Sequence, residues 1–173
     1  MGATFVKPLL RTFPGVALRT ADRQTGANEF RGLAVPSRAD TIATILRKYK
    51  TLAIVGLSAK PSRPSYGVAA YMRAHGYRVI AVNPNTDAIF HERCYDSLED
   101  IPEPIDVVVI FRRPEHVPPV VKSAISKGAK VVWMQEGIVN EAAASVARKA
   151  GLEVIQDACI LKEHAKRFLA DGI

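Results

Sequence analysis

Cysteine is scarce in this sequence: its 173 residues include two, Cys94 and Cys159, and no CxxC pair. We therefore expect no disulfide framework and interpret the cysteines as free thiols in a reducing cytoplasm. No apolar run approaches the roughly 18 residues of a membrane-spanning helix, so we expect no membrane partner. His75, His91 and His116 lack the spacing of metal ligands, and we expect no metal site.

The common phosphate-binding fingerprints are also incomplete. A Walker A loop is absent, and the run from Gly56 to Pro61 keeps only the first glycine of the dinucleotide pattern G-x-G-x-x-G. That pattern requires an acidic residue at the end of the second strand, where this sequence has Asn83-Pro84-Asn85. These absences disfavour NAD. A basic loop without the ribose-binding acid suits a nucleotide with an extra phosphate group, and NADP and coenzyme A (CoA) are the two candidates.

The chain is basic, and its charge is unevenly distributed. The formal net charge is +7, and residues 1–50 hold nine Lys and Arg against three Asp and Glu. The excess positive charge therefore belongs to the N-terminal part, which argues against nucleic-acid binding by the rest of the chain. Apolar residues make up 48% of the sequence, which is usual for a globular protein, and the length suggests one domain.

Residues 1–36 show no helical or strand periodicity and are interrupted by proline and glycine. We interpret them as a basic, irregular N-terminal arm that is flexible or that contacts a protein partner or a second copy of the chain. Two alternatives are a targeting presequence, which would place the protein in an organelle, and a basic tail that contacts nucleic acid. Residues 37–173 are interpreted as one folded domain.

From Ser37 onward, short β-branched strands alternate with amphipathic helices. This alternation predicts an α/β fold, namely a Rossmann-like, doubly wound, mainly parallel sheet in three α/β/α layers. Strands are expected at residues 51–56, 78–82, 106–111, 130–134 and 153–155, with a weak candidate at 92–94. Helices are expected at 66–75, 117–127, 140–149 and 162–169, as a short turn at 97–102, and along an apolar stripe from Ile42 to Tyr49 capped by Ser37 or Asp40.

The segment after the first strand is the main candidate site. Gly56 would let the backbone turn sharply beside a ligand, and a helical pattern follows near Tyr66. Backbone amides in such a strand, glycine turn and helix bind phosphate groups, while hydroxyls and cations add contacts. The candidate residues of this first loop are Gly56, Leu57, Ser58, Lys60, Arg63, Ser65, Tyr66 and Gly67. An ordinary polar surface loop is the competing interpretation.

Further polar residues follow the later strands, whose carboxyl ends should share one edge of the sheet. They are Asn83 and Pro84 after the second strand, Phe111, Arg112 and Arg113 after the third, and Gln135 and Gly137 after the fourth. A ligand crevice where the strand order reverses would bring them together. Turn geometry, solvated charge and helix capping are the competing explanations.

Five sequence blocks, at residues 56–67, 82–85, 110–114, 133–137 and 157–164, together resemble the family of stand-alone CoA-binding proteins. This family is similar to the CoA-binding domain of the succinyl-CoA synthetase α subunit, and the resemblance covers about residues 38–170. It implies that the pyrophosphate and adenosine of CoA lie over the first loop and the end of the second strand. The pantetheine arm would then run toward residues 111–114 and 135–137.

Two departures bear on the activity. The synthetase subunit has a second domain with a phosphorylated histidine, which these 173 residues lack, and it carries a lysine where this sequence has Asn85-Thr86-Asp87. The resemblance therefore implies a protein that binds CoA or acyl-CoA without ligase chemistry, with Arg63 or Lys60 on the 3′-phosphate. Two alternatives stay open: an NADP-linked oxidoreductase or CoA-thioester-processing enzyme using the same crevice, and an interaction protein acting through its basic arm.

Asp157, Cys159 and His164 lie within eight residues and are the candidates for a thiol nucleophile with a base. The competing interpretation is that Cys159 is a small packed side chain and that His164 points outward from the last helix. We favour the second interpretation and expect no catalytic residue.

Overall fold

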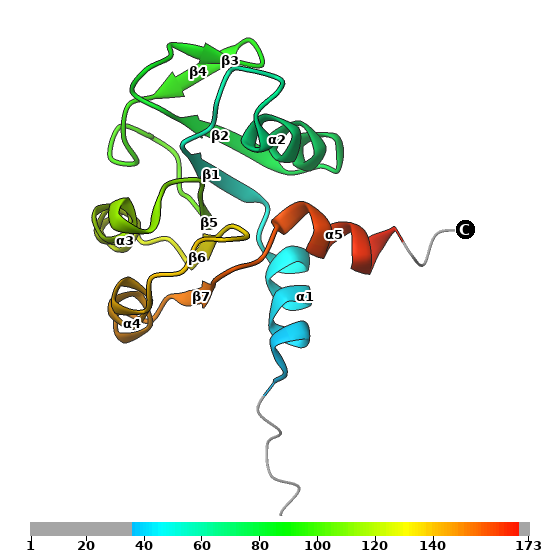
Figure 1. Ribbon diagram of the computed structural model, residues 1–173, viewed down its shortest axis with the longest axis vertical. Helices are drawn as coiled ribbons and strands as arrows, with labels where there is room; N and C mark the ends of the chain where they lie inside the picture. Colours follow the sequence, from blue (N-terminus) through cyan, green and yellow to red (C-terminus); the bar gives the residue numbers. More distant parts are fainter. Residues whose placement is uncertain (1–35, 170–173) are drawn as a thin grey trace, which may run out of the picture. The chain divides into compact units, whose positions relative to one another are not determined.

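The computed structural model describes residues 36–169, so residues 1–35 of the predicted arm lie outside the described part (Figure 1). The strands are β1 (Thr51–Val55), β2 (Arg78–Val82), β3 (Ala88–Ile89), β4 (Glu92–Tyr95), β5 (Val107–Ile110), β6 (Val131–Met134) and β7 (Glu153–Ile155). They form a seven-stranded sheet with the order β3-β4-β2-β1-β5-β6-β7. All neighbours are parallel except β3 and β4, which are antiparallel. The predicted doubly wound α/β fold is confirmed.

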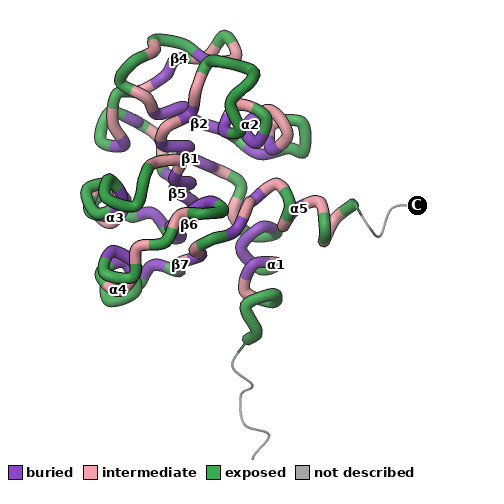
Figure 2. The backbone as a smooth tube through the Cα atoms, viewed as in Figure 1, coloured by how far each residue is buried: buried purple, intermediate pink, exposed green. Residues whose placement is uncertain are grey.

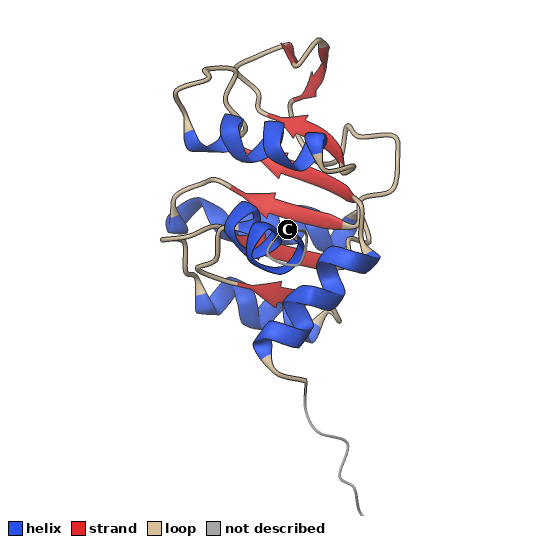
Figure 3. Cartoon of the chain, turned by 90° about the vertical axis from the view of Figure 1, so that its right-hand side faces the viewer, coloured by secondary structure: helices blue, strands red, loops and turns tan. Residues whose placement is uncertain are grey.

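Helices cover both faces of this sheet (Figures 1 and 3). α1 (Arg38–Lys48), α2 (Pro64–Ala74) and α5 (Ile160–Phe168) pack on one face, and α3 (Val117–Ser126) and α4 (Glu141–Lys149) pack on the other. Alternate strand residues enter the two cores, so that Ile54 packs under the first group of helices and Val55 under the second. Every residue of β5 and β6 is buried, which explains their uninterrupted apolar sequences (Figure 2).

The strand order reverses at β1. The chain passes from β1 to β2 and β4 on one side, then returns to place β5 on the other side of β1. In open parallel sheets, ligands bind beyond the carboxyl ends of the strands at such a switch point. The tips of β1 and β5 therefore define where a site is expected.

The region between β2 and β5 departs most from the sequence-based expectations. The weak strand candidate is a real strand, β4, which pairs with β2 and with the unpredicted β3. Phe90 and His91 connect β3 to β4 with φ angles of 58° and 62°, which is the conformation of a tight hairpin turn that usually contains glycine. Because glycine is absent here, the sequence carried no signal for the hairpin.

Other element boundaries also differ from the expectations. The segment at 97–102 forms a turn in which the Asp100 carboxylate accepts the Ser97 N–H at 3.0 Å, and it does not continue as a helix because Pro102 and Pro104 lack the N–H groups that a helix would need. α2 begins at Pro64, two residues earlier than expected, and α5 begins at Ile160. Proline suits the first position of a helix because the N–H that it lacks would have no intrahelical partner.

His164 of α5 points inward, so the expectation that it points outward is wrong. The residue is 7% exposed, and its Nδ1 lies 3.0 Å from the hydroxyl oxygen of Tyr71 in α2. The His75 ring lies 5.2 Å from the His164 ring, and Tyr77 packs edge-on at 5.5 Å. Burial is the main cause that lowers the pKa of His164, and electrostatic repulsion from the neighbouring His75 and Lys50 side chains adds to it.

We expect this histidine to make the fold sensitive to acid. Its pKa in the folded state lies below the usual 6.5, so the unfolded chain binds the proton more tightly. The contribution of His164 to the free energy of unfolding is therefore fully present above pH 6.5 and decreases as the pH falls below 6.5. Its size is about 1.4 kcal/mol for each unit by which folding lowers the pKa. Urea unfolding at pH 7.5 and 5.5 should show a smaller loss in His164→Gln than in the wild type. His91→Asn, at an exposed site, should keep the full loss; an equal loss in all three proteins would contradict the assignment.

Candidate functional site

The tips of β1, β2 and β5 are held together at Gly56. The Gly56 N–H donates to the Val82 carbonyl at 2.9 Å, and the Phe111 N–H donates to the Val55 carbonyl at 2.9 Å. Gly56 has a φ of +87°, and a Cβ at this position would lie 2.6 Å from the carbonyl oxygen of Phe111. The neighbouring strand alone therefore requires glycine at this position, whether or not a ligand is bound.

The first loop satisfies many of its own polar groups. The Ser58 N–H donates to the Ser65 hydroxyl at 3.1 Å, and the Lys60 N–H donates to the Ser58 hydroxyl at 3.2 Å. The side-chain amide of Asn83 donates to the carbonyl of Leu57, which is fully buried, at 2.8 Å. These groups fix the shape of the loop. Ser65 is itself buried, so its hydroxyl serves the loop and not the surface.

The two cationic side chains of this loop form no such hydrogen bonds within it. Lys60 and Arg63 are exposed, and neither forms an ion pair with another residue of the described part. Arg63 is the N-cap residue of α2, but no side chain accepts a hydrogen bond from the amides of the first turn. Gly67 and Tyr66 lie in that turn. The start of α2 thus combines a helix N-terminus that lacks a side-chain cap with two exposed positive charges, and such an arrangement can bind phosphate groups.

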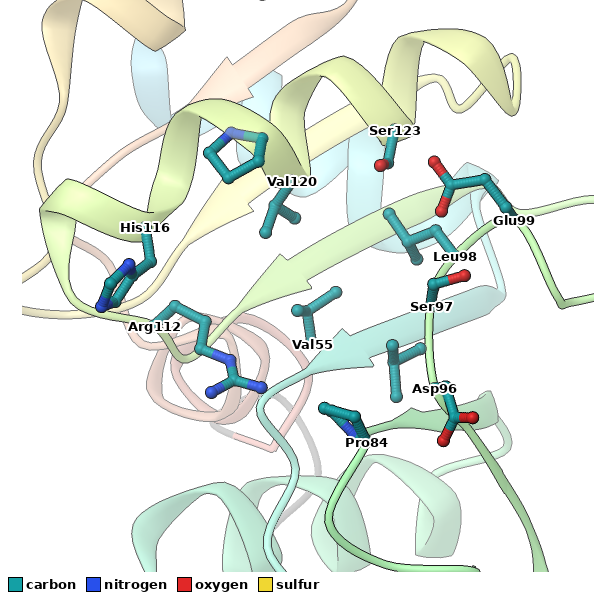
Figure 4. Close-up of a pocket in the computed structure, with 12 residues that line it drawn as sticks. Val55, Pro84, Asp96, Ser97, Leu98, Glu99, Arg112, His116, Val120 and Ser123 are labelled. Carbon is teal, nitrogen blue, oxygen red and sulfur yellow. The ribbon is translucent and has the colours of Figure 1, made fainter.

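A cavity of about 380 Å³ opens beside the switch point, on the α3 face of the sheet (Figure 4). It lies between the tips of β1 and β2, the segment that follows β4, and the start of α3. Its lining is largely apolar along the sheet and polar at both ends. The lining residues are Val55, Val82, Pro84, Asp96, Ser97, Leu98, Glu99, Arg112, His116, Pro119, Val120 and Ser123.

Arg112 is the cation of this cavity. Its side chain is half-buried and points toward Val55 and Pro84 (Figure 4). Its Nε lies 3.3 Å from the position that a Cβ of Gly56 would take, so the guanidinium borders the first loop. No hydrogen bond or ion pair joins this guanidinium to any residue from 36 to 169. Arg113, in contrast, is exposed and precedes the short 3-10 helix η1 (Pro114–His116) outside the lining.

The acidic end of the cavity is formed by residues that sequence reasoning did not select. Asp96, Ser97, Leu98 and Glu99 follow β4, whose carboxyl end reaches the same edge of the sheet as the tip of β2. The Ser123 hydroxyl on α3 lowers the pKa of the Glu99 carboxyl. Recognition of residues 92–94 as a parallel strand would have pointed to these residues, because all parallel strands end at one edge.

The tip of β6 contributes a buried amide. Gln135 is 4% exposed, and its Nε2 has no hydrogen-bond partner in the described part of the chain. Gly137 has a φ of +81°, and its N–H donates to an Asp157 carboxylate oxygen at 2.7 Å. Gly137 therefore uses its amide within the protein. Gln135 keeps a donor that a ligand could satisfy, and leaving such a donor buried and unpaired is costly.

The structure does not assemble Asp157, Cys159 and His164 into a hydrogen-bonded group. Asp157 accepts from Gly137, and His164 bonds to Tyr71 across α2 and α5. Cys159 is the N-cap residue of α5 and is half-buried. Within residues 36–169, no three His, Cys, Asp or Glu side chains are arranged to hold a metal ion. The described helices include none long and apolar enough to cross a membrane.

Comparison with known proteins identifies the class of this chain. The model of the CoA binding domain family matches residues 50–165. The uncharacterized protein YneT of Bacillus subtilis is 42% identical over 130 residues, which cover 75% of this chain and 96% of YneT. A solved protein from Pyrococcus horikoshii OT3 is 38% identical with a TM-score of 0.73, over 83% of this chain and 98% of that one. The chain therefore belongs to the CoA binding domain family.

A larger relative contains the same domain as a part. The ADP-forming acetate–CoA ligase II of Archaeoglobus fulgidus is 30% identical over 95 residues, which cover 53% of this chain. The matched region is 14% of the ligase. This agrees with the predicted resemblance to a domain of CoA ligases.

We expect two glycine substitutions to act in opposite directions. Gly56→Ala should destabilise the fold by at least about 2 kcal/mol, since it adds left-handed strain and a contact with the Phe111 carbonyl. Gly67→Ala, inside α2 with no atom within 4 Å of the added Cβ, should stabilise it by about 0.5–1 kcal/mol. Urea unfolding at neutral pH measures both. A tolerated Gly56→Ala would show that the tips of β1 and β5 can separate without loss.

Proposed function

We propose that this protein binds CoA or an acyl-CoA at the carboxyl edge of its sheet, as a binding module. The observation that carries the proposal is the cavity at the switch point, with the unpaired Arg112 guanidinium beside Gly56. Membership of the CoA binding domain family supports the choice of CoA. An uncompensated, half-buried guanidinium favours a ligand that carries phosphate, because Arg binds phosphate oxygens in a bidentate manner.

The phosphate groups would lie over the first loop. The N-terminus of α2 and the Arg112 guanidinium would contact the pyrophosphate, while Lys60 or Arg63 would reach the 3′-phosphate. In this proposal the Ser58 and Ser65 hydroxyls hold the loop in shape by accepting backbone N–H groups, and the Ser58 hydroxyl keeps a hydrogen that it can donate to a phosphate oxygen.

The adenosine part would occupy the cavity. Val55, Val82, Pro84 and Leu98 provide an apolar surface for the adenine ring, and Asp96 and Ser97 provide polar atoms at the rim. The pantetheine arm would pass the tips of β5 and β6, where Phe111 and the unpartnered amide of Gln135 lie. Burial of a flat apolar ring together with a few placed polar groups is typical of ligand cavities of this size.

Calorimetry with CoA, NADP and NAD on the full chain tests the ligand class. We expect CoA to bind and NAD not to bind, because no acidic residue stands at the tip of β2 to accept the ribose hydroxyls. Binding of NADP with none of CoA would replace the proposal by an NADP-linked one.

The two adjacent arginines give a matched pair of variants. Arg112→Ala should weaken CoA binding by about tenfold to a hundredfold, since it removes charge-assisted hydrogen bonds worth about 1.5–3 kcal/mol. Arg113→Ala removes the same charge from an exposed position outside the cavity, and we expect less than about a threefold loss. Titration calorimetry at constant salt compares them. Equal losses would indicate a general effect of charge instead of a contact by Arg112.

A further inference from the structure

The thiol of Cys159 lies at the carboxyl edge of the sheet, close to the tip of β6. The preceding residue, Ala158, accepts the indole N–H of Trp133 at 2.7 Å, and its own N–H donates to the Met134 carbonyl at 3.5 Å. The chain then enters α5, which covers the face of the sheet that holds Trp133. Cys159 packs against this same core and is half-buried.

The unpartnered amide of Gln135 belongs to the same place. Side chains alternate along an extended strand, so Gln135 extends from β6 on the face of Trp133, one step nearer the carboxyl edge. Phe111 extends β5 on this face as well and packs on the same core. Gln135 is 4% exposed with a free Nε2 donor, which indicates an acceptor that the protein itself does not supply.

Cys159 lies at the start of a helix. It is the N-cap residue of the nine-residue helix α5. Lys162 follows in the first turn. The hydrogen-bonded Glu136 is the main cause that raises the pKa of Lys162, and negative charge on Cys159 adds to it, which places the two side chains within electrostatic reach.

The second thiol of the chain provides an internal contrast. Cys94 in β4 is 6% exposed, and its S–H faces the Asn83 carbonyl oxygen at 3.6 Å. Burial raises the pKa of the Cys94 thiol and keeps it protonated. The two cysteines therefore differ in access, although both are free.

We propose that Cys159 is a thiol–disulfide exchange site for disulfides of CoA, with Gln135 donating a hydrogen bond to a carbonyl of the pantetheine arm. This inference rests on the proposed CoA site. The Cys159 thiolate attacks one sulfur of a CoA disulfide, a protein–CoA disulfide forms, and the original S–S bond breaks. The second CoA leaves as a thiolate and takes a proton from water. One disulfide replaces another, so no further oxidant is required.

The experiment incubates the full chain with the symmetrical disulfide of CoA and follows intact mass over time. We expect a gain of one CoA moiety, formed at least tenfold faster than the adduct with cystine at the same concentration, because the bound nucleotide holds the disulfide beside the thiol. An analogue of CoA that lacks the sulfur should slow the reaction with the CoA disulfide and leave the reaction with cystine unchanged.

Three variants locate the reaction. Cys159→Ser should abolish the adduct, and Cys94→Ser should keep it; peptide mapping of the wild-type adduct locates the modified cysteine if Cys94→Ser fails to fold. Gln135→Leu should slow formation of the CoA adduct without lowering the urea midpoint, because it removes a buried unpartnered donor. An unchanged rate in Gln135→Leu would overturn the role of Gln135.

Calorimetry with reduced CoA on Cys159→Ser separates this inference from the proposed function. CoA binding without an adduct in the wild type would overturn the exchange and leave the CoA site intact. An adduct on Cys94, or equal rates with CoA disulfide and cystine, would also overturn it. Absence of CoA binding would remove the proposed function as well.

Discussion

The contact between the tips of β1 and β5 at Gly56 is the constraint on which the candidate site depends. Two strands can approach this closely only because Gly56 has no side chain where the Phe111 carbonyl lies. The same approach brings Arg112 beside the first loop, so the guanidinium and the turn at Gly56 meet although they are far apart in sequence. The switch in strand order places this meeting point at the edge where ligands enter folds of this class.

The hydrogen bonds within the first loop indicate a site that is largely formed before a ligand arrives. Ser58, Ser65 and Asn83 bond to the backbone of the loop and hold it against the tip of β2. A ligand therefore orders little of the protein when it binds, and more of the contact energy contributes to affinity. The charged side chains left for the ligand in and beside the first loop are Arg112, Lys60 and Arg63, all of which are positive.

The layered fold could be predicted from sequence because β1, β2, β5 and β6 are short apolar runs buried on both faces. The residues at the tips of β1, β2 and β5 were also predictable, since strand tips follow directly from strand positions. The cavity residues Asp96 to Glu99 were not predicted, because they follow a strand with only one buried residue, Cys94. The orientation of His164 was missed as well, since one helix sequence does not reveal that Tyr71 of α2 will bond to it.

The hairpin of β3 and β4 places a very short strand at one edge of the sheet. β3 has two residues and β7 has three, so the sheet ends on short strands at both sides. A short edge strand offers another chain few free backbone groups to pair with, which limits the addition of strands from other proteins to the sheet. We therefore expect association of residues 36–169 with another protein to use helix surfaces and loops more than strand addition.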